Sequence, residues 1–74
     1  MPRLPVTSGA QVVKALMQAG FVVIRVKGSH HAMRHPDGRN TSVPVHGSQD
    51  LPPGTLRAIL RQTELTVAEF SLLL

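Results

Sequence analysis

The sequence predicts an α+β domain in which a helix, a three-stranded antiparallel meander, a second helix and a short last helix follow in that order. Apolar residues recur at helical spacing over residues 9–19, and strand-like runs separated by glycine-containing turns fill residues 21–46. Helical spacing returns from Pro53 onward. A chain of 74 residues fits one domain, so we take residues 1–74 as a single folded unit.

The first helix is predicted over Gly9–Ala19. Ser8, followed three residues later by Gln11, forms a capping-box pattern, and Gly20 suits the position just beyond the helix end. The apolar stripe of this helix consists of Val12, Val13, Leu16 and Met17. We expect Met17 to fill the core.

The first hairpin is predicted from Phe21–Lys27 and His30–His35, joined by Gly28-Ser29. Gly-Ser between two strand-like runs indicates a two-residue turn with glycine at its first central position. The alternation of side chains gives the hairpin one polar face and one apolar face that carries the core. The expected pairs are Lys27 with His30, Arg25 with Ala32 and Val23 with Arg34 on the polar face, and Val26 with His31, Ile24 with Met33 and Val22 with His35 on the apolar face.

The second turn, Pro36-Asp37-Gly38, allows two registers for the third strand. A two-residue Asp-Gly loop would place Val43 and Val45 on the basic face. A three-residue loop, with Gly38 left-handed in a G1 bulge, places Thr41, Val43 and Val45 on the apolar face instead. We favour the second, because register follows the hydrophobic pattern. Ser42, Pro44 and His46 then share the face of Lys27.

The second helix begins at Pro53, which fits the first helical position. Its apolar stripe consists of Leu56, Ile59 and Leu60. Thr66 with Glu69 repeats the capping-box pattern, so a last helix is predicted over Thr66–Leu74 with Phe70 turned inward. A sheet this small has one face to bury, so both main helices cover the same face and the basic face stays open.

The charge of the chain points to a polyanionic partner. Eight Lys and Arg against four Asp and Glu give a net charge of +4. Arg25, Lys27, Arg34 and Arg39 lie in the central third with only Asp37 opposing them, and such a basic stripe attracts nucleic acid. The chain has no Tyr or Trp, so phosphate and sugar contacts are expected rather than stacking on bases.

Composition also indicates the cellular compartment. The absence of cysteine excludes disulfides and thiolate chemistry and fits a reducing environment. The start of the chain lacks the apolar core of a signal peptide, and no apolar run could span a bilayer. We therefore expect a cytoplasmic protein with no membrane association.

The chemistry centres on Lys27 and His30, which face each other across the predicted turn. A lysine can bind a phosphate, and an imidazole can move a proton near neutral pH. With Arg25 and Arg34 behind them, these residues offer a base for a 2′-hydroxyl and cations for a charged phosphorane. Those are two of the three groups that metal-free RNA cleavage requires.

Other chemistries have less support. His30 and His31 point to opposite faces, and His31 and His35 lie about 13 Å apart along a strand, too far to share one zinc ion. Ser29 beside His30 has neither an orienting acid nor a Gly-x-Ser-x-Gly elbow. We expect no metal and no cofactor.

Several segments together carry a family resemblance through their order and spacing. They are Leu16-Met17-Gln18-Ala19-Gly20-Phe21, Arg25, Lys27-Gly28-Ser29-His30-His31, Arg34-His35-Pro36-Asp37-Gly38-Arg39, Val43-Pro44-Val45-His46, Pro53-Gly54-Thr55-Leu56-Arg57-Ala58-Ile59-Leu60-Arg61-Gln62, and Leu65-Thr66 with Glu69-Phe70. With these segments, nearly the whole chain resembles the HicA family of bacterial toxins, which are small mRNA interferases paired with HicB-type antitoxins.

The resemblance implies a fold like that of double-stranded-RNA-binding domains and a toxin of a type II toxin–antitoxin system that acts in stress response. It implies an endoribonuclease that cleaves mRNA, with His30 as the catalytic base and a HicB-like antitoxin as partner. The second helix carries no charge before Arg57, so RNA is expected at the sheet face and first hairpin instead. The residues expected to bind RNA phosphates are Arg25, Lys27, Gly28, Ser29, Arg34 and His46.

Two other functions would use the same basic face. A non-catalytic RNA-binding module would bind RNA without cutting it, and a docking module would bind only a partner protein. Incubation with single-stranded RNA in EDTA distinguishes the nuclease from both.

Overall fold

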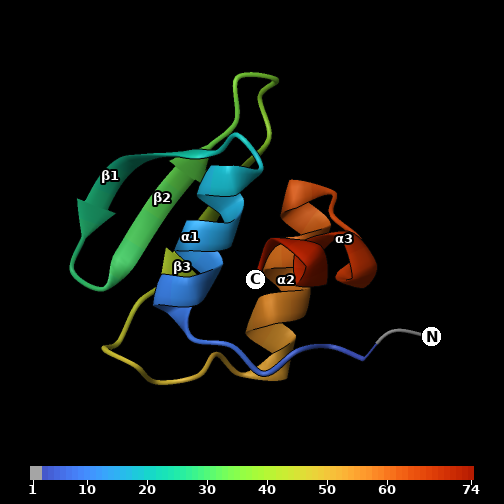
Figure 1. Cartoon of the computed structure of the whole chain (residues 1–74). Coiled ribbons are helices and arrows are strands. Elements are labelled where there is room, and N and C mark those ends of the chain that lie inside the picture. The colour runs from blue at the N-terminus through green and yellow to red at the C-terminus, as the bar shows by residue number, and fades with distance from the viewer. Residues whose placement is uncertain (1–2) are drawn as a thin grey trace.

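The computed structural model describes residues 3–74, which form one sheet covered on one face by helices (Figure 1). The three strands are antiparallel in the order β1-β2-β3. The elements are α1 (Gly9–Gln18), β1 (Val22–Lys27), β2 (His30–Arg34), β3 (Asn40–Pro44), α2 (Pro53–Thr63) and α3 (Val67–Leu73). The predicted α+β fold, a helix–meander–helix arrangement like that of double-stranded-RNA-binding domains, is confirmed. No helix within residues 3–74 has the length and apolar character needed to cross a bilayer.

The core lies between the sheet and the helices. Phe21 and Phe70 are fully buried there, as the sequence predicted. Phe21 immediately precedes β1 instead of opening it. The remaining buried apolar residues are Val12, Ala15, Leu16, Met33, Val43, Leu56, Ile59 and Leu60. Removing such side chains from water is the main force that holds a sheet this small against its helices.

Both predicted capping boxes form. The amide of Gln11 donates to Ser8 Oγ at 3.3 Å, and the amide of Ser8 donates to Gln11 Oε1 at 3.0 Å. Thr66 and Glu69 repeat this exchange at the start of α3, at 3.0 and 2.9 Å. Each box satisfies helix-end amides that would otherwise lack partners. At α2, Pro53 occupies the first helical position as expected.

The first hairpin has the predicted turn but a different register. Gly28 takes φ +59° at the first central position, as a type II′ turn requires. Lys27 pairs with His30, and Arg25 pairs with Ala32. A β-bulge then makes Ile24 the extra residue of β1. Three predicted pairs were therefore wrong: Ile24 does not pair with Met33, Val23 lies opposite Met33 rather than Arg34, and Val22 lies opposite Arg34 rather than His35.

β1 is more exposed than predicted. We expected Val22, Ile24 and Val26 to face the core. All four apolar side chains of β1, these three and Val23, are instead 36–57% exposed. The helices contact β3 more than β1, and β1 lies at the outer edge of the sheet (Figure 1). The prediction that Met17 fills the core was also wrong, because its side chain is 55% exposed.

The second turn has the three-residue form that we favoured. The amide of His35 donates to the carbonyl of Arg39 at 2.8 Å, which closes the loop around Pro36-Asp37-Gly38, and Gly38 has a positive φ. Thr41 and Val43 are consequently buried, whereas Ser42 faces the open side.

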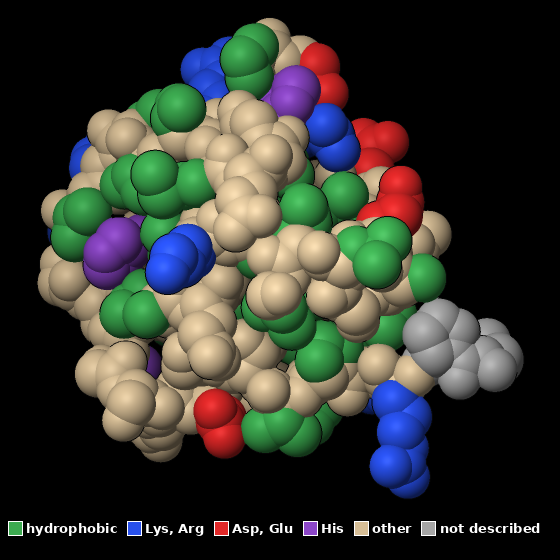
Figure 2. Space-filling view, in the orientation of Figure 1, with side chains coloured by type: hydrophobic (Ala, Val, Ile, Leu, Met, Phe, Trp, Pro, Cys, Tyr) green, Lys and Arg blue, Asp and Glu red, His purple; other side chains and the backbone are tan. Residues whose placement is uncertain are grey.

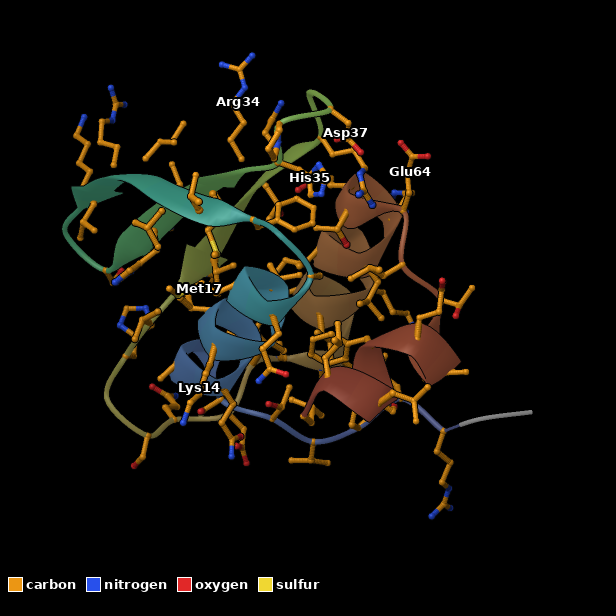
Figure 3. The ribbon with its side chains drawn as sticks, turned by 45° about the horizontal axis from the view of Figure 1, so that its top comes forward. Lys14, Met17, Arg34, His35, Asp37 and Glu64 are labelled. Carbon is orange, nitrogen blue, oxygen red and sulfur yellow. The ribbon has the colours of Figure 1, made fainter. Side chains whose placement is uncertain are left out.

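The second turn is also tied to the helices. Arg39 donates to the carbonyl of Thr63 at the end of α2, and its guanidinium lies 5.2 Å from the centre of the Phe21 ring. The ring of His35 contacts Phe21 edge-on, with centroids 5.1 Å apart, and Figure 3 shows His35 beside this end of α2. Asp37 completes the cluster: it accepts from the Arg39 amide at 3.0 Å, and this bond holds the pKa of Asp37 below its ordinary value.

Candidate nucleic-acid interface on the open face

The sheet face turned away from the helices, which we call the open face, carries the predicted functional side chains except His46. Register places Lys27 beside His30 and Arg25 beside Ala32 at the first hairpin. Arg34 points away from the helices at the other end of β2 (Figure 3). These cations and His30 are exposed to solvent. The pairing that the sequence predicted at the hairpin tip is therefore present.

A hollow of about 470 Å³ opens between these residues. Small side chains at Ala32 and Ser42, which pair in register on β2 and β3, form its floor. The residues that line it are Arg25, Lys27, Gly28, His30, Ala32 and Ser42. The hollow thus presents one imidazole and two cations to the same volume.

A second hollow of about 660 Å³ adjoins the first, since both are lined by Ala32 and Ser42. Arg34 and Asn40, which pair in register, line this second hollow. A strand with phosphates at regular intervals could therefore cross the open face and meet cations at both ends.

The turn that carries His30 is also held by a hydrogen bond from the residue that follows β3. The amide of Val45 donates to the carbonyl of Ser29 at 2.7 Å, which ties the end of β3 to the hairpin tip. The ring of His31 lies with Nδ1 3.4 Å from the same carbonyl. The backbone carbonyl of Ser29 therefore already has partners within the protein, and these contacts hold the turn in place.

No acidic side chain within residues 3–74 lies within ion-pair distance of Arg25, Lys27 or Arg34. Within residues 3–74, the close contacts between basic and acidic side chains, from His35 and from Arg39, both go to Asp37. Arg39 therefore forms an ion pair within the second turn and does not contribute a free cation to the open face. Of the four basic residues in the central third of the sequence, Arg25, Lys27 and Arg34 remain for a ligand.

His46 lies apart from the other predicted site residues. It follows the end of β3 and lines a different hollow of about 330 Å³ with Asp50 and Thr55. A carboxylate there would repel phosphate. The structure does not bring His46 into either hollow of the open face.

Sequence reasoning did not select Ala32 and Ser42 as site residues, although it placed both on this face. The sequence feature that could have indicated them is the small size of two side chains that pair in the middle of the sheet, which leaves room for a ligand. Within residues 3–74, no three His, Asp or Glu side chains lie close enough together to hold a metal ion.

Comparison with known proteins places most of the chain in a known family. A search of curated proteins gave no match. Residues 9–65, well over half of the chain, match the family described as "HicA toxin of bacterial toxin-antitoxin". The matched region runs from α1 through the sheet to the end of α2 and includes every cation of the open face. The chain therefore belongs to the HicA toxin family of bacterial toxin–antitoxin systems.

Proposed function

We propose that this toxin is a metal-independent endoribonuclease that cleaves mRNA in the cytoplasm, with His30 as the general base. The observation that carries the proposal is the hollow in which His30, Lys27 and Arg25 line one volume. RNA phosphates are the polyanions that such a face would attract. The 2′-hydroxyl of RNA supplies a nucleophile beside each phosphate, so no metal-bound water is needed.

In the proposed reaction, His30 removes the proton of a ribose 2′-hydroxyl. The 2′-oxygen then forms a bond to the adjacent phosphorus, and the bond from phosphorus to the 5′-oxygen breaks. The products are a 2′,3′-cyclic phosphate and a 5′-hydroxyl, whose proton comes from solvent or a protonated side chain. Lys27 and Arg25 stabilise the negative charge that develops on the phosphorane oxygens.

Arg34 has a binding role in this proposal. It lines the adjoining hollow rather than that of His30, so it would hold a neighbouring phosphate. Gly28 and Ser29 shape the turn and offer backbone atoms near the bound strand. His46 is left out of the proposed site, because it lies in the hollow that contains Asp50.

A toxin of this family has an antitoxin partner, and we propose that a HicB-like protein fills that role. The open face is the surface it would cover, with acidic side chains against Arg25, Lys27 and Arg34. Inhibition would then be steric, and association would be fast and sensitive to salt because opposite charges steer the encounter.

The test is cleavage of single-stranded RNA by purified protein in EDTA. We expect fragments with cyclic phosphate ends, and no cleavage of a matched oligonucleotide that lacks 2′-hydroxyls. His30→Ala should lower the single-turnover rate by about 10²–10⁴-fold, while its circular dichroism and melting temperature stay close to wild type, because His30 is exposed.

His30→Gln is the matched control, since it keeps a polar side chain but cannot act as a base. RNA binding by this variant should persist while cleavage is lost. A folded His30→Ala protein that cuts RNA at the wild-type rate would overturn the assignment. RNA binding without cleavage by the wild type would instead identify a non-catalytic RNA-binding module.

A further inference from the structure

The outer edge of β1 is a surface that the proposed reaction does not use. β1 pairs with β2 on one side and with no strand of residues 3–74 on the other. An edge strand of this kind presents backbone N–H and C=O groups that can pair with another chain. β3, at the opposite edge, packs against α2 and ends at Pro44, which has no N–H. Of the two edges, β1 is the one suited to accept a further strand.

Apolar side chains surround this edge. Those of β1 are between one third and three fifths exposed, and Met17 of α1 is exposed beside them. Figure 3 shows Met17 on the side of α1 that faces β1, and Figure 2 shows hydrophobic side chains at the surface on this side of the molecule. Exposed apolar surface next to unpaired backbone groups is typical of sites where a strand is added.

The charges of β1 decide what kind of strand fits. Arg25 and Lys27 lie on this strand. Neither forms an ion pair with an acidic side chain of residues 3–74. If two copies of the chain joined through β1, their four cations would lie along one short ladder, where like charges destabilise pairing. An acidic strand would meet opposite charges instead.

We propose that β1 accepts an extended acidic segment of the antitoxin as a fourth strand of the sheet. Carboxylates of that segment would lie against Arg25 and Lys27, and the alternate apolar side chains would lie against Val23, Val26 and Met17. The consequence of the proposal rests on the proposed function. A strand about 4.8 Å beyond β1 would withdraw two cations from RNA phosphates, in addition to the cover that the antitoxin places over the open face.

The experiment follows backbone amide signals of the ¹⁵N-labelled full chain during titration with synthetic peptides. One peptide alternates Glu and Val over seven residues, and the matched peptide has Lys in place of Glu. Up to millimolar concentration, the Glu-Val peptide should shift the amide signals of Val22–Lys27 and slow their hydrogen exchange. The Lys-Val peptide should leave them unchanged. In the complex with the antitoxin, the same amides should be protected.

Two variants carry the same change at different places. Val26→Glu puts a carboxylate on the edge, and Leu72→Glu puts one on an 87% exposed position of α3. Both residues are exposed, so both variants should fold. We expect Val26→Glu to weaken binding of the Glu-Val peptide by about tenfold or more and Leu72→Glu to leave it unchanged.

Other results would overturn the proposal. These are no response to the Glu-Val peptide, an equal response to both peptides, or shifts confined to the open face of β2 and β3. A dimer that Val26→Glu dissociates would assign the edge to a second copy and would also overturn it. RNA cleavage, measured in parallel, is independent: its absence would remove the proposed nuclease function and leave the result on strand addition standing.

Discussion

Lys27 and Arg34 stand at opposite ends of the open face, and each lines its own hollow. Their side chains are exposed and form no part of the core. Their contribution to RNA binding is therefore expected to be electrostatic, through release of counterions from phosphates. This distinguishes them from His30, whose proposed role lies in the proton transfer.

Lys27→Gln and Arg34→Gln are each expected to weaken RNA binding and to make its dependence on salt shallower. Each lost phosphate contact should lower the slope of log K against log salt by roughly one. Affinity measured at several salt concentrations checks this. Arg57→Gln, the same charge change on the exposed side of α2, is the control. Slopes equal to wild type in both site variants would show that RNA binds elsewhere.

Gly28 is expected to tolerate substitution poorly for a backbone reason. No atom lies within 4 Å of the position that a Cβ would occupy, so space is not the obstacle. The obstacle is φ +59°, which penalises a β-carbon by about 1–2 kcal/mol. Gly28→Val should lower the free energy of unfolding by that amount and reduce cleavage, because the turn carries His30.

Gly28→Asn is the comparison, since asparagine accepts positive φ more readily than β-branched residues. Its free energy of unfolding should lie between those of wild type and Gly28→Val. A Gly28→Val protein with wild-type stability and activity would mean that the turn can adopt another form without moving His30.

At the level of elements, the start of α1 lies directly on the end of β3. A Cβ on Gly9 would come within 2.0 Å of the carbonyl oxygen of Pro44. In contrast, a Cβ on Gly54, in the first turn of α2, would meet nothing within 4 Å. The two glycines of the helices therefore have different roles.

Gly9→Ala is expected to destabilise the protein by about 1–3 kcal/mol, because the backbones must move apart. Gly54→Ala should stabilise it by about 0.4–1 kcal/mol, because alanine favours a helix and reduces the freedom of the unfolded chain. Urea unfolding of both variants measures the difference. Equal effects of the two changes would show that α1 can shift away from β3 without loss.

The same elements show what could be predicted from the sequence. The starts of α1 and α3 were predictable because the capping boxes of Ser8 and Thr66 involve only residues three positions further along the chain. The bulge was not, because Val22, Val23 and Ile24 are three consecutive apolar residues and alternation cannot select which one faces the core. The exposure of β1 was also unpredictable, since it depends on how far the helices extend across the sheet.

The candidate site divides in the same way. Lys27 and His30 could be paired from a two-residue turn, which fixes register locally. The position of His46 could not, because it depends on the path of the loop between β3 and α2. Nor could the sequence reveal that Arg39 binds the end of α2, a contact between residues 24 positions apart.

For the whole molecule, two carboxylates link stability to pH. The Arg39 amide lowers the pKa of Asp37 from its ordinary 3.8, and the Thr66 amide lowers the pKa of Glu69 from its ordinary 4.5. As pH falls below about 4.5, the unfolded chain takes up protons before the folded chain does. The stability that these groups contribute is present above that range and is lost as pH falls through their folded pKa values.

Asp37→Asn combined with Glu69→Gln should therefore flatten the dependence of the free energy of unfolding on pH in the acid range. At neutral pH the double variant should be less stable than wild type, and the two curves should converge as pH falls. Urea unfolding across this range measures both. Parallel curves for the two proteins would contradict the assignment.

The hydrogen bond from Val45 to Ser29 has a consequence for the order in which the protein is made. A nascent chain that extends only to the end of β2 already contains His30 and the whole first hairpin. It lacks the amide that holds the carbonyl of Ser29. Since synthesis proceeds from the N-terminus and folding can begin before it ends, the geometry of the hairpin tip is completed only after Val45 has emerged. Any chemistry that depends on that geometry therefore begins late in the production of each molecule.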